Sequence, residues 1–147
     1  MVTRYLVDTN VFVYARGRDH PSRLPCRAVL RAGANRLIDL EASVELVQEY
    51  AHLLLRRGVN RPAALTEIGE VRSQCRLHAF DLEVLDGCTA LLGRYPTLGV
   101  RDAVHAATAL RAGITTILSV DRVFDTVSEI QRYDPATPGA SWLAGQE

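Results

Sequence analysis

Four acidic residues stand where predicted strands end or in the first turns of predicted helices: Asp8, Glu49, Asp102 and Asp121. They are far apart in the sequence, so only the folded chain can bring their carboxylates together. A cluster of carboxylates repels itself, and chains keep one when a hard cation, usually Mg²⁺ or Mn²⁺, neutralises it. The residue types therefore predict metal-dependent phosphodiester chemistry as the leading function.

Each of these acids also has a purely structural interpretation. Asp8 and Asp121 follow predicted strands, where an aspartate is a good N-cap for the next helix. Asp102 lies in the first turn of a predicted helix, where a carboxylate gains from the helix dipole. Glu49 shares the polar face of its helix with Glu45, one turn earlier, and the spacing does not choose between them. The four acids together favour a site more strongly than any one alone.

Four nearby polar residues are predicted to support the acids: Thr9, Asn10, Ser119 and Asp125. The first two follow the exit of the first strand. Ser119 can hydrogen-bond the water shell of a bound metal, and Asp125 can join Asp121 from one turn later. His105, three residues after Asp102, is interpreted as a core or supporting histidine rather than a metal ligand.

The hydrophobic pattern alternates strands with helices. Strands are predicted at 4–8, 35–40, 77–80, 115–120 and 131–133, the last as an edge strand. Helices are predicted after residue 10 and at 22–33, 42–57, 61–74, 81–95 and 101–112, with a turn or short helix at 121–124. This order predicts an α/β fold, a three-layer α/β/α sandwich with a mostly parallel central sheet. Ligands bind beyond the carboxyl ends of such strands, where Asp8 and Asp121 are expected.

The composition is that of an ordinary globular protein, with 147 residues of which 48% are hydrophobic and 23% charged. One domain over residues 1–147 is predicted, with 136–147 as a loosely held tail in which Trp142 can dock. No apolar run approaches the ~20 residues of a membrane span, and no signal-peptide pattern is present. Three scattered cysteines fit neither a disulfide framework nor a metal site. These features predict a cytoplasmic protein without membrane contact.

The formal charges balance, with 17 basic and 17 acidic side chains. All 17 basic residues are arginines, whose planar guanidinium suits phosphate well. Five of them follow the first strand and form either a nucleic-acid contact or a solvated helix face: Arg16, Arg18, Arg23, Arg27 and Arg31. A net charge of zero argues against general polyanion binding, so any RNA contact is expected to be local.

Four segments, in order along nearly the whole chain, resemble the motifs of the PIN domain family and, within it, the VapC toxins of bacterial toxin–antitoxin pairs. They are residues 6–11 (LVDTNV), 43–50 (SVELVQEY), 101–110 (RDAVHAATAL) and 118–125 (LSVDRVFD). On this register the four family acids fall on Asp8, Glu49 rather than Glu45, Asp102 and Asp121. The segment Asp39-Leu40-Glu41 departs from the apolar strand that usually precedes the second motif.

The resemblance implies an Mg²⁺ or Mn²⁺ site in which Asp8 and Asp102 bind the metal, with Glu49 and Asp121 as further ligands. It implies endonucleolytic cleavage of single-stranded RNA, a homodimer, and inhibition by a small VapB-like antitoxin. An arginine of that partner is expected to enter the acidic pocket. Two apolar segments, 12–14 and 53–55, are candidates for part of its groove.

Three other functions stay open at this point. One is a housekeeping PIN-type nuclease outside a toxin–antitoxin pair. Another is an aspartate-based phosphatase, which would use a second carboxylate two residues after Asp8, but Asn10 stands there and cannot transfer protons. The third is a non-enzymatic binding module whose acids only cap helices. Metal-dependent RNA cleavage by the purified protein separates the nucleases from the other two.

Overall fold

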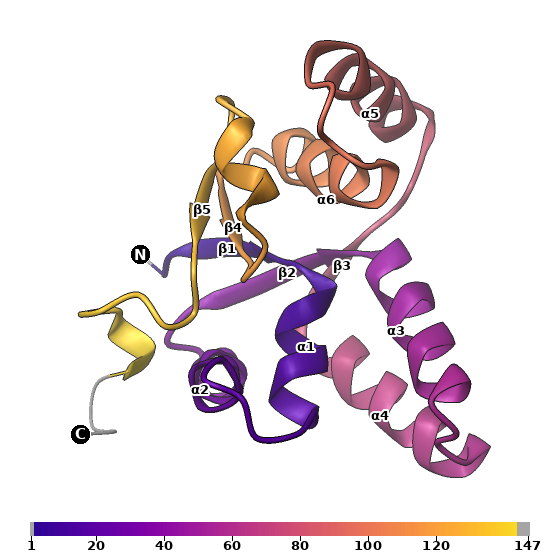
Figure 1. The fold of residues 1–147 in the computed structure, drawn as a ribbon, viewed down its shortest axis with the longest axis vertical. Helices are drawn as coiled ribbons and strands as arrows, with labels where there is room; N and C mark the ends of the chain where they lie inside the picture. The colour runs from indigo at the N-terminus through magenta and orange to yellow at the C-terminus, as the bar shows by residue number, and fades with distance from the viewer. Residues whose placement is uncertain (1, 144–147) are drawn as a thin grey trace.

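The computed structural model describes residues 2–143, and a five-stranded sheet in the order β3-β2-β1-β4-β5 lies at its centre (Figure 1). Each pair of neighbouring strands is parallel. The strands are β1 (Arg4–Val7), β2 (Asp39–Ser43), β3 (Arg76–His78), β4 (Thr116–Leu118) and β5 (Gln131–Tyr133). The last strand lies at an edge of the sheet, as predicted.

Within residues 2–143, helices cover both faces of the sheet, α1 to α4 on one face and α5 and α6 on the other (Figure 1). They are α1 (Thr9–Arg16), α2 (Arg23–Ala34), α3 (Val44–Arg56), α4 (Arg61–Gln74), α5 (Leu82–Arg94) and α6 (Val100–Arg111). Two short 3-10 segments, η1 (Arg122–Thr126) and η2 (Ser141–Leu143), follow β4 and β5. The predicted three-layer α/β/α fold is confirmed.

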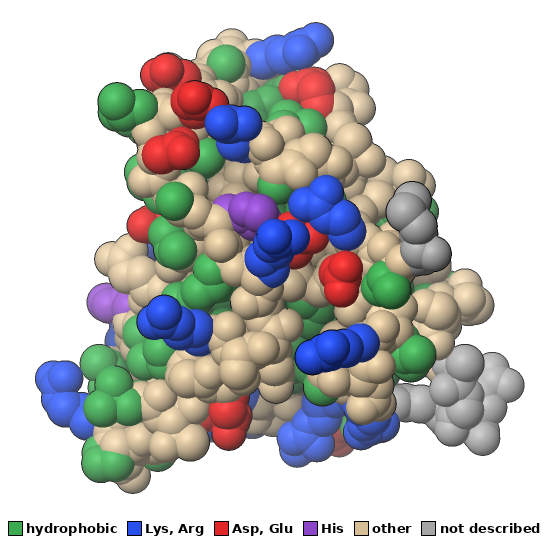
Figure 2. Space-filling model, turned by 180° about the vertical axis from the view of Figure 1, so that it is seen from behind, with side chains coloured by type: hydrophobic (Ala, Val, Ile, Leu, Met, Phe, Trp, Pro, Cys, Tyr) green, Lys and Arg blue, Asp and Glu red, His purple; other side chains and the backbone are tan. Residues whose placement is uncertain are grey.

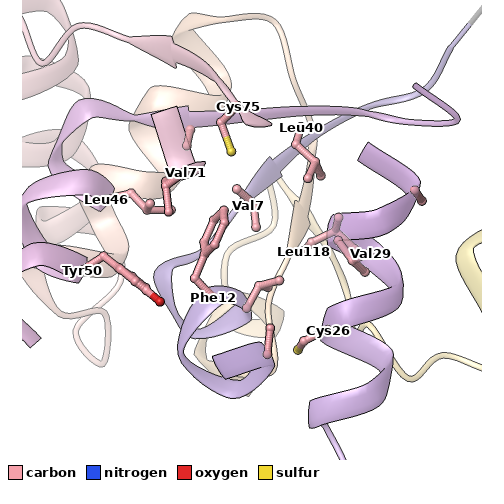
Figure 3. Close-up of a cluster of buried hydrophobic side chains, with 14 of the residues drawn as sticks. Val7, Phe12, Cys26, Val29, Leu40, Leu46, Tyr50, Val71, Cys75 and Leu118 are labelled. Carbon is pink, nitrogen blue, oxygen red and sulfur yellow. The ribbon is translucent and has the colours of Figure 1, made fainter. Parts of the chain in front are cut away.

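Alternate residues of the central strand β1 point to opposite faces and take part in two separate apolar cores. Leu6 packs with α5 and α6, whereas Val7 packs with α1 to α4. Figure 3 shows this second core, in which Val7, Phe12 and Leu118 lie among side chains of the surrounding helices. Because both faces are covered, β1 is apolar without interruption just before Asp8.

The second strand differs from the prediction, since it runs over Asp39–Ser43 instead of 35–40. Arg36 takes a left-handed backbone conformation with φ of 58°, which interrupts the extended chain, and Leu37 is 66% exposed. The helix predicted at 42–57 begins at Val44, because Ser43 ends the strand and its hydroxyl accepts a hydrogen bond from the Glu45 N–H at 3.1 Å.

Glu41 is the reason why β2 lacks the continuous apolar sequence expected of a buried strand. Its side chain is 2% exposed and is held by two basic residues from the neighbouring strands. Arg4 donates from Nε at 2.6 Å and from Nη2 at 2.9 Å, and His78 Nε2 lies 2.8 Å from Glu41 Oε1. The pair with Arg4 lowers the pKa of Glu41, so the strand buries a charge that its neighbours neutralise.

The segment after β5 returns to the sheet, although 136–147 was expected to be loosely held. Trp142 is buried, its indole N–H donates to the Pro135 carbonyl at 2.6 Å, and its ring meets Tyr5 edge to face at 5.7 Å between centroids. Residues 144–147 lie outside the described part of the chain. Among residues 2–143, no helix combines the length and the apolar character needed to cross a membrane.

Candidate active site

The carboxyl edge of the sheet gathers the predicted acids. Asp8 follows β1 directly, and its backbone N–H donates to the Leu118 carbonyl at the end of β4 at 3.0 Å. Asp121 follows β4 by three residues, Glu49 lies in the second turn of α3, and Asp102 lies in the first turn of α6. The crossovers of a parallel sheet thus bring four distant segments to one place.

Asp8 stands at the N-cap position of α1, yet its side chain makes no capping hydrogen bond. Its carboxylate is buried and accepts a hydrogen bond from Ser119 Oγ at 2.7 Å. Burial raises the pKa of the Asp8 carboxyl, and the nearby His105 and the Ser119 hydrogen bond offset this only in part. The capping explanation therefore does not account for Asp8, whose charge points into the site.

Ser119 joins three parts of the site through one fully buried hydroxyl. It donates to Asp8 and accepts from Asn10 Nδ2 at 3.1 Å and from the Asp121 N–H at 3.0 Å. Asn10 also accepts, at 3.4 Å, from the Val120 N–H. Ser119 and Asn10 are therefore positioning residues, because they fix Asp8 and the backbone of Asp121 relative to each other.

His105 lies at the centre of the site and is 2% exposed. Its Nε2 lies 3.5 Å from Asp8 Oδ1, 3.6 Å from Glu49 Oε2 and 3.4 Å from Thr9 Oγ1. Burial alone lowers the pKa of His105, but Glu49, Asp8 and Asp102 outweigh burial and raise it. Its Nδ1 has no hydrogen-bond partner among the described residues. The His105 ring thus faces both Asp8 and Glu49, and their charges favour its protonated form.

Glu49, not Glu45, contacts the other site residues. It accepts a hydrogen bond from Thr9 Oγ1 at 2.9 Å and forms an ion pair with Arg101 Nη1 at 3.6 Å. The contact with His105, helped by Thr9 and Arg101, lowers the pKa of Glu49. Glu45 lines an adjoining cavity. The geometry thus separates two glutamates that helical spacing leaves equivalent.

Asp102 also lies in surroundings that disfavour its charged form. Burial raises its pKa to about 6, and the charges of Asp8 and Asp121 add to that effect, while His105 opposes it. Asp121 is exposed and caps η1, accepting a hydrogen bond from the Val123 N–H at 3.0 Å. The field that Asp8 and Asp121 exert on Asp102 places all three acids in one electrostatic cluster.

Asp125, predicted to support the cluster, is engaged elsewhere. Arg132 donates to its two carboxylate oxygens, from Nε at 2.9 Å and from Nη2 at 3.1 Å. This exposed pair lowers the pKa of Asp125. Arg132 also donates to the Ser119 carbonyl at 3.1 Å, so Asp125 reaches the site only through Arg132.

The donor chemistry of the acids fits a hard divalent cation, which prefers carboxylate oxygens. Among residues 2–143, however, no three Asp, Glu, His or Cys side chains already surround one point as metal ligands do. Asp8 and Glu49 contact His105 instead, and the same ring opposes the rise in the pKa of Asp102 only in part.

Sequence reasoning missed the central place of His105 and the pairing of Arg101 with Glu49. One signal was available, because His105 lies three residues after Asp102 in α6 and therefore on nearly the same helix face. The depth of burial of the ring was not readable from that spacing. Its identity as the hub of the site depends on contacts with α1 and α3, which only the fold supplies.

Comparison with known proteins agrees with this arrangement. The PIN domain family model matches residues 5–130. Ribonuclease VapC7 of Mycobacterium tuberculosis (strain ATCC 25618 / H37Rv) is 34% identical over 142 residues, covering 95% of this chain and 97% of the relative. The crystal structure of Mycobacterium tuberculosis VapC20, a Sarcin-Ricin loop cleaving toxin, superposes with a TM-score of 0.69 at 19% identity, covering 84% of this chain and 95% of that one. DNA-bound VapBC from Salmonella typhimurium gives a TM-score of 0.66 at 18% identity, with coverages of 92% and 99%.

The fold is thus that of a PIN domain. The chain belongs to the PIN domain family and, within it, to the VapC ribonucleases. The two structural neighbours support the fold alone at their level of identity.

Proposed function

We propose that this protein is an Mg²⁺- or Mn²⁺-dependent endoribonuclease toxin that a cognate VapB-like antitoxin neutralises. The observation that carries the proposal is the under-neutralised acidic cluster, in which Asp8 is buried and the pKa of Asp102 is raised to about 6. Its relationship to a protein named a ribonuclease, over nearly the full length of both chains, supports RNA as the substrate.

The proposed metal ligands are Asp8 and Asp102, with Glu49 and Asp121 as further donors. A bound Mg²⁺ or Mn²⁺ supplies Lewis-acid polarisation of the scissile phosphate and lowers the pKa of its water. The chain's own residues prepare the site for that charge. Ser119 holds Asp8, whereas Thr9 holds Glu49 at 2.9 Å, so two of the acids are oriented in advance.

His105 has a separate proposed role as a positioning residue. Its ring touches Asp8 and Glu49 and compensates part of their charge before a cation is bound.

The rival functions are disfavoured by particular contacts. A phosphatase would need an acid at position 10, where the Asn10 side chain is engaged by Ser119 and Val120. A binding module with acids as caps does not explain Asp8, whose side chain makes no capping bond. A housekeeping nuclease would have the same site, so only the partner separates it from a toxin.

The proposed antitoxin places an arginine among the acids, since a guanidinium pairs well with carboxylates and competes with metal. The two apolar segments expected to form its groove are only partly accessible. Phe12 and Leu54 belong to the buried core, whereas Leu55 is 39% exposed. We further propose a homodimer, a cytoplasmic location, and a single domain over residues 1–147, which the return of Trp142 to β1 supports.

The decisive experiment incubates purified protein with single-stranded RNA. We expect cleavage with Mg²⁺ or Mn²⁺, none in EDTA, and recovery when the metal is restored. Cleavage that persists in EDTA would refute the metal mechanism, and phosphate release from monoesters without RNA cleavage would favour the phosphatase.

The toxin assignment needs a second test, in which the small protein encoded next to this gene is co-expressed. We expect a complex that survives purification and restores growth. If the neighbour neither binds nor neutralises an RNA-cleaving chain, the housekeeping nuclease is the correct function.

A further inference from the structure

A cavity of about 430 Å³ opens beside the acidic site, between α3, the first turns of α6 and the linker from β3 to α5. Its volume lies in the range of small-ligand pockets. Glu49 and His105 belong both to the cavity and to the acidic site, so the two are continuous. Whatever occupies the cavity lies next to the reacting phosphate of the proposed reaction.

The cavity carries basic groups where the acidic site has almost none. Arg56 lies in the last turn of α3, and Arg101, whose side chain is 75% exposed, precedes Asp102. A pair at 3.6 Å with Glu49 leaves most of the Arg101 guanidinium donors available. Because the net charge is zero and acidic and basic side chains intermix on the face in Figure 2, phosphate contacts must come from such local groups.

The cavity also carries an exposed aromatic ring. Phe80 lies in the β3–α5 linker directly before Asp81, the N-cap of α5, and is 38% exposed. An aromatic face beside guanidinium groups suits an unstacked nucleobase and its phosphate. The polar side chains of Glu45 and Gln48 line the same cavity and can hydrogen-bond the edge of a base.

We propose that this cavity is a subsite for one nucleotide of single-stranded RNA next to the scissile phosphate. The base stacks on Phe80, and Arg56 and Arg101 hold the adjacent phosphate. The inference rests on the proposed function, since it assigns a position to part of the RNA substrate.

The mixed chemistry of the cavity favours RNA over the other candidate occupants. A helix of an antitoxin or a second copy of this chain would need a continuous apolar surface. Here the apolar side chains of Leu53, Phe80, Val100 and Val104 are interrupted by the ionisable side chains of Glu45, His52, Arg56 and Arg101. Continuity with the acids, through Glu49 and His105, further favours the substrate strand.

RNA binding tests the subsite in the full chain. An Asp8→Asn background prevents cleavage, and fluorescence anisotropy follows a labelled single-stranded RNA dodecamer library. Phe80→Ala is expected to raise the Kd about 10-fold, and Phe80→Trp to keep the parent Kd, because any aromatic face can stack. The matched control is Leu82→Ala, which removes a nearby side chain that is 77% exposed and is expected to change the Kd less than about twofold.

The arginine contribution has its own readout. Arg56→Ala is expected to make the plot of log affinity against log salt shallower by about 0.7, the value for one phosphate on a single strand. Arg57→Ala is the matched control, because Arg57 is exposed and adjacent but lies outside the cavity lining. Its salt slope is expected to match that of the parent.

Cleavage mapping by RNA-end sequencing, with Asp8 restored, completes the test. Phe80→Ala is expected to lose base preference at one position beside the cut while still cleaving. Parent-like binding and cleavage by both Phe80→Ala and Arg56→Ala would overturn the subsite. Two other outcomes would also overturn it. In one, light scattering shows that Phe80→Ala separates two copies of the chain and that RNA affinity falls for this reason alone. In the other, Phe80→Ala loses antitoxin binding and keeps RNA binding. If the unmodified chain cleaves no RNA, the proposed function fails, while the binding comparison still decides the subsite.

Discussion

Glu41 lies in β2, and Asp8 directly follows the neighbouring parallel strand β1. Both carboxylates are buried, but their surroundings differ. Glu41 is 2% exposed and Asp8 is 6% exposed. Arg4 and His78 contact Glu41 at 2.6 to 2.9 Å, and the pKa of Glu41 is lowered. Asp8 has a neutral hydroxyl at 2.7 Å and an imidazole at 3.5 Å, and burial raises its pKa.

The difference separates an acid whose charge its neighbours compensate from acids whose charge they compensate only in part. The charge of Glu41 is compensated within the chain, so its contacts are complete. Burial raises the pKa of Asp8 and of Asp102, His105 offsets this only in part, and the charges of Asp8 and Asp121 raise the pKa of Asp102 further. Burial is therefore a poor guide to function, whereas burial together with missing compensation is a good one.

The largest expected effect is on RNA cleavage, which should depend on Asp8 and not on Glu41. Asp8→Asn keeps the size and can still accept from Ser119, but it removes a metal-binding charge. RNA cleavage at pH 7.5 is expected to fall at least about 10²-fold. The melting temperature is expected to stay or rise, because an uncompensated buried charge is gone. If the Asp8→Asn protein kept full RNA-cleaving activity at equal expression, the proposed contrast between Asp8 and Glu41 would be wrong.

The second largest effect on cleavage is expected at Glu49, and it tests which of the two glutamates of α3 acts in the site. Glu49→Gln is expected to lower the cleavage rate about 10²-fold, because the Glu49 carboxylate touches Thr9 and His105. Glu45→Gln is the comparison variant, with an expected change below about threefold, because the glutamine amide can still hydrogen-bond a base in the adjoining cavity. The two rates are compared at saturating Mg²⁺ and again at low Mg²⁺. Equal losses in both variants would contradict the geometric assignment.

The acidic cluster is also expected to respond to pH. Asp102 is protonated more readily in the folded state, so its contribution to the free energy of unfolding falls as pH rises from 3.8 to about 6 and is level above that. Bound metal favours the deprotonated form. The rise in melting temperature on adding Mg²⁺ should therefore be larger at pH 7.5 than at pH 5. Asp102→Asn should reduce this pH difference, to which Asp8 also contributes because its pKa is raised as well, and a larger rise at pH 5 would refute the prediction.

Glu41 is expected to behave in the opposite way. Glu41→Gln leaves Arg4 and His78 without a charged partner and should lower the free energy of unfolding by about 2 kcal/mol at pH 7, with RNA cleavage per folded molecule unchanged. Since the folded-state pKa of Glu41 lies below its ordinary value of 4.5, the difference should shrink as pH falls below 4.5. Urea unfolding at pH 7 and pH 3.5 measures both values. A loss of cleavage without a loss of stability would assign Glu41 to the active site.

Asp125→Asn is expected to have the smallest effect. The Asp125 side chain is 51% exposed and its partner is Arg132, so stability should change by less than about 1 kcal/mol. Cleavage should change by less than about threefold. A loss as large as that of Asp8→Asn would place Asp125 among the metal ligands.

The sequence predicted the fold well because most of its signals are local. Apolar runs, caps such as Asp81 and the small residues of α6 act over a few neighbours. The second strand failed because its evidence is long-range. Glu41 fits a buried strand only when Arg4 and His78, 37 residues away on either side, lie beside it. A pattern of hydrophobicity along the chain does not contain that pairing.

The four acids were named from the sequence, but their roles were not separable there. Motif position supplied Asp8, Glu49, Asp102 and Asp121, whereas the direction of each side chain depends on packing. The contacts of His105 and the hydrogen bond from Ser119 distinguish Asp8 and Glu49 from simple caps, whereas Asp121 does cap η1. Their place in metal binding stays a prediction that the variants above test.

The link between β1 and β4 has a consequence for biosynthesis. Asp8 is fixed by Ser119, 111 positions later in the chain, and its backbone bonds to Leu118. A ribosome that has translated only the first two thirds of the message has made Asp8 and Glu49 but not the residues that orient or complete them. The nascent chain is therefore catalytically incompetent until its final strands emerge.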